Sequence, residues 1–236
     1  MSSLFLSNKQ ISRVFFESLF GAVCVEEGAE WIDLIFSHSP GVSKESGEMR
    51  TGSMSRRSAL ILWLLSKYFQ PKVIVEVGTH IGRSTMALAG GSDCLVRLFT
   101  CDAGVPAFDP SWSDHELQKK LSFYNCGSTK LFSSMVKENI KADLFFFDGE
   151  IMPDDREFIK QLAHEKSVLI FDDCEGVTKG IENLIVSKSI FPDRIVLQDF
   201  QGLHSLQFDQ SSTLAVSIPK TMIRLTEQQM LPLSMY

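Results

Sequence analysis

Two kinds of apolar pattern alternate along this chain. Short continuous runs rich in β-branched and aromatic residues predict buried strands, and longer stretches with apolar residues every three or four positions predict helices. The predicted strands are 73–77, 95–100, 121–124, 143–148, 167–172, 194–200 and 213–218, and the predicted helices after residue 55 are about 56–69, 83–89, 114–121, 131–140, 154–164 and 176–189. Regular alternation of this kind predicts an α/β fold with a mostly parallel, doubly wound sheet.

The two ends of the chain depart from this alternation. The connection between the last two strands, with its polar segment 207–212, is too short for a helical crossover, so these strands are predicted to pair antiparallel at one end of the sheet. Residues 11–36 predict two amphipathic helices that either cap the core or form a lid or dimer contact, and 39–55 predict a loop. We therefore divide the chain into an N-terminal helical extension and loop, 1–55, and a main domain, 56–236.

The stretch 73–89 reads as a strand, a glycine loop and a helix. Such a junction places free backbone N–H groups and the positive end of a helix beside a spot that glycine leaves open, which suits an anionic or carboxylate-bearing ligand. The glycines are Gly78 and Gly82, and His80 stands where a dinucleotide fingerprint has its middle glycine. Glu76, inside the strand end, needs hydrogen-bond donors from the loop or from a ligand. The loop is predicted to cradle a cofactor.

Asp102 follows the second predicted strand, twenty-four residues after Gly78 (102 − 78). A carboxylate at the carboxyl end of a strand can accept hydrogen bonds from both hydroxyls of a ribose. This position indicates a nucleoside cofactor, and it does not distinguish S-adenosylmethionine (SAM) from NAD.

Glu76, Gly78, Gly82 and Ser84 match E-x-G-x-x-x-G-x-S, which resembles the first motif of class I SAM-dependent methyltransferases. The resemblance implies a Rossmann-like seven-stranded sheet with one antiparallel strand, and a bound SAM. Together with the positions of the strand ends and of the helix at 56–69, it gives these candidate cofactor residues: Met54, Glu76, Gly78, Thr79, His80, Gly82, Ser84, Asp102, Ala103, Gly127, Ser128 and Asp148.

Two of these cofactor assignments have plainer alternatives. Gly127 and Ser128 follow the third strand, where the resemblance places adenine, but Ser128 equally fits a helix cap. Met54, with Gly52 and Ser53, fits the methionine end of SAM, or a simple helix start capped by Ser53 or Ser55.

Five acids are predicted to share the carboxyl rim of the sheet: Glu76, Asp102, Asp148, Asp172 and Asp173. The last three can offer oxygen ligands to Mg²⁺. Over residues 52–219 this arrangement is similar to the metal-dependent small-molecule O-methyltransferases, which include catechol, macrolide-sugar and aminocoumarin-sugar enzymes. The resemblance implies Mg²⁺ held by Asp148, Asp172 and Asp173. In the alternative, Asp172 and Asp173 cap the next helix and Asp148 orients the methionine amine.

The usual general-base position of these enzymes is apolar here, because the chain reads Asp148-Gly149-Glu150-Ile151. Asp148 with the metal then suffices, or a base comes from His80, His164 or His204. Our catalytic candidates are Asp148 and His80.

Composition narrows the class of protein. A net charge of −6 argues against a nucleic-acid binder, and five cysteines without C-x-x-C spacing indicate neither a disulfide framework nor a zinc site. The N-terminus shows no secretory pattern, and the apolar run 59–65 is far shorter than the ~20 residues that span a bilayer. We expect a soluble cytoplasmic protein without membrane partners, which forms a homodimer if its N-terminal helices are a contact surface.

The predicted function is transfer of a methyl group from SAM to a hydroxyl of a small-molecule acceptor, assisted by Mg²⁺. The alternatives are a metal-independent N- or C-methyltransferase, an inactive SAM-binding module and an NAD oxidoreductase.

Overall fold

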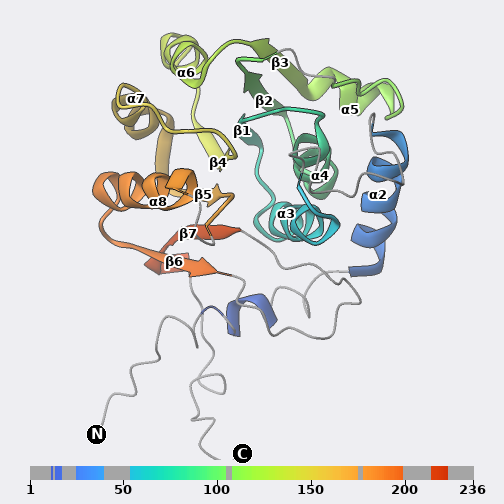
Figure 1. Cartoon of the computed structure of the whole chain (residues 1–236), viewed down its shortest axis with the longest axis horizontal. Coiled ribbons are helices and arrows are strands. Elements are labelled where there is room, and N and C mark those ends of the chain that lie inside the picture. The colour runs from blue at the N-terminus through green and yellow to red at the C-terminus, as the bar shows by residue number, and fades with distance from the viewer. Residues whose placement is uncertain are drawn as a thin grey trace, which may run out of the picture.

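A seven-stranded sheet forms the centre of the computed structural model, which describes residues 12, 14–17, 25–39, 54–104, 108–174, 178–198 and 214–222. The strand order is β3-β2-β1-β4-β5-β7-β6 (Figure 1). The strands are β1 Val73–Val77, β2 Arg97–Asp102, β3 Leu121–Asn125, β4 Ala142–Phe147, β5 Ala163–Phe171, β6 Arg194–Gln198 and β7 Ala215–Pro219. β7 runs antiparallel to both β5 and β6, and the other pairs are parallel. The predicted sheet with one reversed strand is confirmed.

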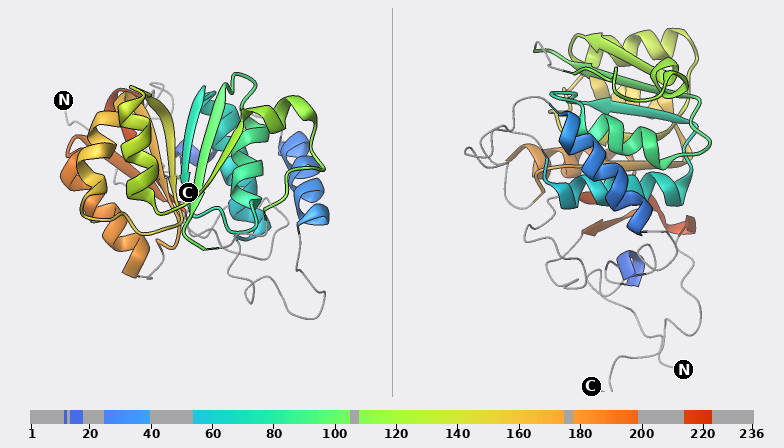
Figure 2. Two further views of the ribbon diagram at one scale, coloured as in Figure 1. Left: turned by 90° about the horizontal axis from the view of Figure 1, so that it is seen from above. Right: turned by 90° about the vertical axis from the view of Figure 1, so that its right-hand side faces the viewer.

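Helices cover both faces of the sheet, as Figure 2 shows from above. One layer contains α2 Val25–His38, α3 Arg56–Phe69 and α4 Arg83–Gly91, and the other contains α6 Ser128–Lys137, α7 Asp155–Leu162 and α8 Thr178–Ile190. The short helix α5 His115–Lys120 leads into β3, and the 3-10 turn η2 Lys220–Met222 follows β7. The doubly wound architecture predicted from the alternating pattern is confirmed.

Strand β4 shows why the central strands are apolar throughout. Its side chains alternate between two cores, with Leu144 and Phe146 packed against the α3 and α4 side and Phe145 and Phe147 on the opposite side. The Phe147 ring stacks on Phe171 with ring centroids 5.4 Å apart. Each such buried phenylalanine contributes roughly 1.5–3 kcal/mol to stability. This burial on both faces fixes β4 at the centre, with its carboxyl end at the rim.

The N-terminal helix α2 packs against α3 and α4. Ile32 and Ile35 are buried, and the Trp31 indole N–H donates to the backbone carbonyl of Met86 at 2.9 Å. Residues 12 and 14–17 are also helical, and Phe16 joins the same core. The packing agrees with the interpretation that these helices cap the core. Most of the predicted loop 39–55, including Gly52 and Ser53, lies outside the described residues.

Helix boundaries follow local capping chemistry. The Ser58 N–H donates to Ser55 Oγ at 3.1 Å, so Ser55 caps α3, as one of our two alternatives predicted. Helix α6 begins earlier than predicted, at Ser128, because Gly127 is its N-cap. The interpretation of Ser128 as a cap is wrong: its hydroxyl donates to Asp155 Oδ2 at 2.6 Å and ties α6 to α7.

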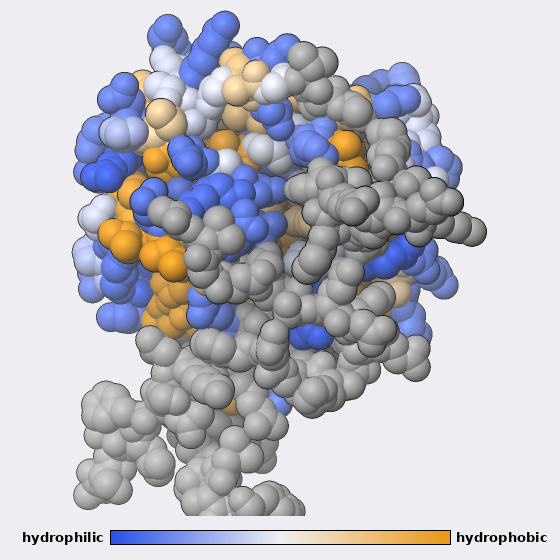
Figure 3. Space-filling view, in the orientation of Figure 1, coloured by the Kyte–Doolittle hydropathy of each residue, from blue (hydrophilic) through white to orange (hydrophobic). Residues whose placement is uncertain are grey.

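The described surface is mostly hydrophilic on the face shown in Figure 3. Some apolar side chains are exposed, such as Ile181 and Ile185 on α8. None of the helices in the described part of the chain combines the length and the apolar character needed to cross a membrane.

Candidate cofactor site

A small open pocket lies where the carboxyl end of β1 meets the tip of β4. Its lining residues are Met54, Gly78, Thr79, His80, Ile81, Arg83, Ser84 and Asp148. The structure thus brings together six residues that we assigned to the cofactor from sequence, and it adds Ile81 and Arg83, which we had not. The pocket opens beside the N-terminus of α4, whose first two residues line it. An anionic group bound there would meet the positive end of the helix.

The two glycines of the loop are required by its geometry. Gly78 has φ +101° and Gly82 has φ +79°, a region that side chains rarely adopt. A Cβ on Gly78 would lie 3.1 Å from the backbone carbonyl carbon of Asp148. On Gly82 it would collide with the ring of Phe108. The loop therefore packs closely against the tip of β4 and leaves the pocket open in front of it.

Glu76 lies behind this loop and does not line the pocket. Its side chain is fully buried and accepts hydrogen bonds from the Thr100 hydroxyl at 2.6 Å and from the Thr85 hydroxyl. Burial raises the pKa of Glu76 to about 7, although hydrogen bonds from Ser84, Thr100 and Thr85 act in the opposite direction. Its Oε1 atom is buried without a hydrogen-bond partner among the described residues. Glu76 thus anchors β1, β2 and α4 beneath the loop.

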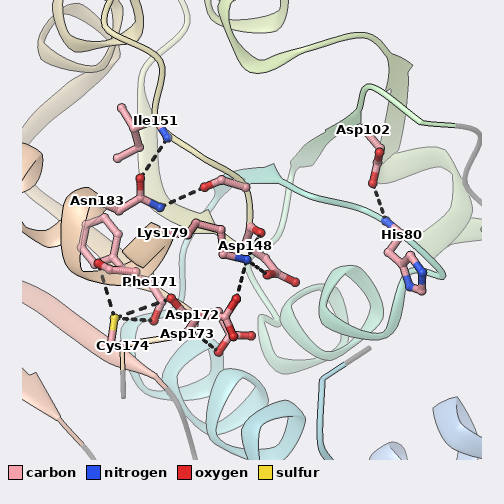
Figure 4. Close-up of polar contacts among 12 residues, drawn as sticks. His80, Asp102, Asp148, Ile151, Phe171, Asp172, Asp173, Cys174, Lys179 and Asn183 are labelled. Carbon is pink, nitrogen blue, oxygen red and sulfur yellow. Dashed lines mark hydrogen bonds and ion pairs between the residues drawn. The ribbon is translucent and has the colours of Figure 1, made fainter. Parts of the chain in front are cut away.

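Asp102 lies at the tip of β2, next to the loop, as Figure 4 shows. Its Oδ2 accepts from the His80 backbone N–H and its Oδ1 from the Gly104 N–H, each at 2.8 Å. Every carboxylate oxygen has a second lone pair, so both oxygens can still accept a hydrogen bond from a sugar hydroxyl. Ala103, in the same turn, is exposed, so its neighbourhood is accessible to a ligand.

Gly127 lies just beyond the tip of β3, the strand next to β2. A Cβ built on Gly127 would meet nothing within 4 Å, so the space in front of it is open. The Ser128 hydroxyl is turned toward Asp155 instead. Contact of adenine with Gly127 and Ser128 stays a prediction. Because the Ser128 hydroxyl is bound to Asp155, we expect Ser128 to contact adenine through its backbone.

At the tips of β4 and β5 the acids surround Lys179, a residue of α8 (Figure 4). The Lys179 ammonium donates to Asp148 Oδ1 at 2.8 Å, to the Asp148 backbone carbonyl at 2.6 Å and to Asp173 Oδ2 at 2.6 Å. Asp172 is buried beside them, and its Oδ1 accepts from the Asp173 N–H at 2.8 Å. The structure thus brings the three predicted acids together, but around a side-chain cation.

The charges of this cluster shift one another. Burial, and after it the neighbouring Asp172 carboxylate, raise the pKa of Asp148 to about 7 against the lowering effect of Lys179. Burial alone would lower the pKa of Lys179, but Asp148 and Asp173 together raise it above its ordinary value. Lys179 therefore stays an ammonium at physiological pH.

The residues present do not fit Mg²⁺. That ion requires oxygen ligands at about 2.0–2.1 Å in octahedral geometry, whereas the Lys179 ammonium already lies between the carboxylates of Asp148 and Asp173. Within the described ranges, no three His, Cys, Asp or Glu side chains form a group that could hold a metal ion. Nor do the described contacts show Asp172 or Asp173 capping α8, the alternative considered from sequence.

Sequence reasoning missed two residues of α8, Lys179 and Asn183. The Asn183 side chain accepts from the Ile151 N–H and donates to the Gly149 carbonyl, both at 2.9 Å, which fixes the loop after β4. The two residues are four positions apart, so they share one face of the helix. That spacing, just after the acidic tip of β5, is a signal that could have indicated them.

The histidines predicted as alternative bases lie in different places. His80 lines the pocket, is exposed, and has a left-handed backbone with φ 46°. His164 pairs with Asp143 at 3.0 Å near the amino ends of β4 and β5, roughly 15 Å along β4 from the rim. His164 is therefore wrong as a base for this site, and His204 lies outside the described residues.

Comparison with known proteins agrees with this geometry. No protein-family model and no curated protein matches the chain. Among solved structures, a methyltransferase from Geobacter sulfurreducens is 14% identical, with 84% of this chain and 96% of that one covered and a TM-score of 0.55. An O-methyltransferase from Bacillus cereus in complex with SAH is 16% identical over 81% and 90%, with a TM-score of 0.51. TomG, an O-methyltransferase from Streptomyces achromogenes in complex with SAM, is 15% identical over 82% and 98%, with a TM-score of 0.51. The chain has the fold of class I methyltransferases.

Proposed function

We propose that this protein transfers a methyl group from SAM to a hydroxyl of a small molecule. The observation that carries the proposal is the pocket at the carboxyl end of β1, enclosed by a glycine loop and a helix N-terminus, with the Asp102 carboxylate beside it. The structural relatives with SAM or SAH bound support a cofactor of this type on this fold.

We assign the methionine end of SAM to the pocket between Met54, Gly78, Ser84 and Asp148, and the ribose to Asp102. Residues Gly127 and Ser128 would border the adenine. When bound, SAM supplies a methyl group that its sulfonium already makes electrophilic. The protein then has to align an acceptor with that methyl and remove a proton from it.

Asp148 and His80 are the titratable side chains that line this pocket besides Arg83. We assign proton acceptance to Asp148, because it lines the pocket and its ion pair with Lys179 fixes the position of its carboxylate. The exposed imidazole of His80 at the mouth is the second candidate.

The position of Lys179 favours methyl transfer without a metal, so we do not retain assistance by Mg²⁺ in the proposal. Metal-free transfer also fits an amine or a carbon acceptor, which is the second candidate function. Analysis of the methylated product would distinguish these acceptors.

The test is to incubate the full chain with SAM and panels of phenolic, sugar and amine acceptors, with and without EDTA, and to measure SAH and methylated products by mass spectrometry. We expect SAH and an O-methylated product in equal amounts, unchanged by EDTA. If the protein binds SAM but forms no SAH with any acceptor, it is a binding module. Loss of turnover in EDTA with recovery on added Mg²⁺ would show that a metal takes part.

A further inference from the structure

We propose that Lys179 is a built-in cation that occupies the place of a divalent metal at the acidic rim and fixes Asp148 at the wall of the cofactor pocket. The site therefore excludes Mg²⁺ and related ions. The exclusion of metal ions is argued from the geometry of the site alone. The expectation that turnover needs no metal rests on the proposed function.

The ammonium of Lys179 has all its donors in use. A lysine ammonium has three N–H groups, and three oxygen atoms lie within 2.6–2.8 Å of Nζ, two from Asp148 and one from Asp173. The side chain is only 22% exposed, which limits its movement and its screening by water. Lys179 thus links the tips of β4 and β5, as a metal ion bound by the same carboxylates would.

The close approach of α8 to the tip of β5 brings Lys179 into place. A Cβ on Gly180 would lie 2.3 Å from the Asp173 carbonyl oxygen and 2.6 Å from that of Asp172. Asp173 itself adopts a left-handed conformation with φ 59°. One helical turn later, Asn183 holds the backbone of the loop after β4. The lysine is therefore part of a tightly packed junction and does not reach in from a free surface.

Charge balance explains what removal of the amine would do. Asp148, Asp172 and Asp173 present three carboxylates in one cluster, and carboxylates that share a site repel one another. Oxygen-rich acidic clusters are what Mn²⁺, Mg²⁺ and Ca²⁺ bind. Methionine at 179 keeps the length and the packing of the stem but removes the cation. The acids do not form a metal-binding group while Lys179 lies between them, and we expect the acids of Lys179→Met to close around an added divalent ion in its place.

Lys179 acts on the pocket through Asp148. Asp148 is the residue that belongs both to the pocket lining and to the ion pair. Lys179 is therefore a positioning residue. We expect Lys179→Met to weaken SAM binding roughly tenfold, as loss of a charge-assisted hydrogen bond would, and Mn²⁺ to restore part of that affinity by fixing Asp148 again.

The experiment is a titration of Mn²⁺ followed by electron paramagnetic resonance. It compares the wild-type chain with Lys179→Met, with the double variant Lys179→Met and Asp148→Asn, and with Lys160→Met as a control. Lys160 pairs with Glu157 on the surface of α7, so its removal takes away one charge outside the site. We expect no bound Mn²⁺ in the wild type or the control, one Mn²⁺ in Lys179→Met, and loss of that ion in the double variant.

Two results would overturn the inference. Binding of one Mn²⁺ by the wild type and by Lys179→Met alike, with loss of the ion in the double variant, would show that Lys179 leaves room for a metal. Absence of Mn²⁺ binding in both the wild type and Lys179→Met, with circular dichroism showing that the variant is folded, would also overturn it. That result would mean that the three acids cannot bind a metal even when Lys179 is removed. If Lys179→Met does not fold, Lys179→Gln, which keeps a polar donor, takes its place. Calorimetry with SAM on the same proteins tests the proposed function separately.

Discussion

Gly78 is the residue at which the cofactor loop touches the tip of β4. Its φ is +101°, and a Cβ added there would lie 3.1 Å from the backbone of Asp148, so it accepts no side chain without strain. We expect Gly78→Ala to lower the free energy of unfolding by about 1–3 kcal/mol and to weaken SAM binding. Denaturant unfolding and calorimetry measure the two effects.

Gly127 is the matched control, because its φ of −72° suits any residue and its Cβ would meet open space. Gly127→Ala should lower the free energy of unfolding by no more than about 0.5 kcal/mol, which is the cost of replacing a glycine N-cap by alanine. Equal stability of the two variants would contradict the role given to the Gly78 backbone.

Glu76 predicts a pH dependence of stability. Its pKa is about 7 in the folded protein, above its ordinary value of 4.5, so the folded state retains a proton that the unfolded chain releases. The stabilisation by this group is complete below about pH 4.5 and is lost as the pH rises through 7, by up to roughly 3 kcal/mol. Glu76→Gln cannot ionise, so its free energy of unfolding, measured with denaturant, should fall less steeply between pH 4.5 and 7 than that of the wild type.

Some decline should remain in Glu76→Gln, because the pKa of Asp148 is raised in the same direction. The same slope in the variant and the wild type would show that Glu76 does not carry the shifted proton.

The residues of the candidate site differed in how far sequence could predict them. Gly78, Thr79 and Ser84 lie close together along the chain, so the strand-loop-helix pattern was enough to place them at one pocket. Asp148 could be placed because parallel strands end at the same rim. Lys179 was harder to place. Its spacing from Asn183 indicates a shared helix face, but whether that face reaches the rim depends on how closely Gly180 lets α8 approach the tip of β5, which is a property of the packing.

Among the helices and loops, α8 and the loop after β4 are held together by Asn183. Asn183→Leu would leave the Ile151 N–H and the Gly149 carbonyl without their hydrogen-bond partner. Asn183 is only 2% exposed, so water cannot easily replace its side chain. We expect a loss of about 1–3 kcal/mol in the free energy of unfolding, measured by urea denaturation. Ile185→Ala, at a position on the same helix that is 64% exposed, should be close to neutral. Equal losses of unfolding free energy in Asn183→Leu and Ile185→Ala would show that the hydrogen bonds of Asn183 do not stabilise this junction.

Element boundaries were predictable where a local signal defines them. The cap at Ser55 and the proline at position 71 bound the predicted helix 56–69, and the β-branched run bounds the predicted strand 73–77; both match α3 and β1 of the structure. The sequence pattern extended the helix 154–164 too far, because β5 begins at Ala163 and pairs with Ala142 of β4. Pairing with a neighbouring strand overrides helical periodicity at such a junction, and a single sequence does not show it.

Across the molecule, the two apolar cores determine where the site lies. Helices occupy both faces of the sheet, so the carboxyl rim is the surface at which the tips of β1, β2, β4 and β5 converge (Figures 1 and 2). Four of the five acids predicted at this rim lie at the tips of β2, β4 and β5, namely Asp102, Asp148, Asp172 and Asp173, and the cation among the last three is Lys179. Glu76, the fifth, is instead buried beneath the glycine loop. A homodimer through the N-terminal helices stays a prediction, and α2 already uses one side against α3 and α4.

Assignment of the pocket to SAM is tested by calorimetric titration of the full chain with SAM and with SAH, alongside Asp102→Asn and the distant surface variant Asp93→Asn. We predict that both ligands bind at one site, that Asp102→Asn weakens both by roughly 10–100-fold through loss of a charged acceptor for the ribose, and that Asp93→Asn binds as the wild type does. Absence of binding to SAM and SAH, or unchanged affinity in Asp102→Asn, would contradict this assignment.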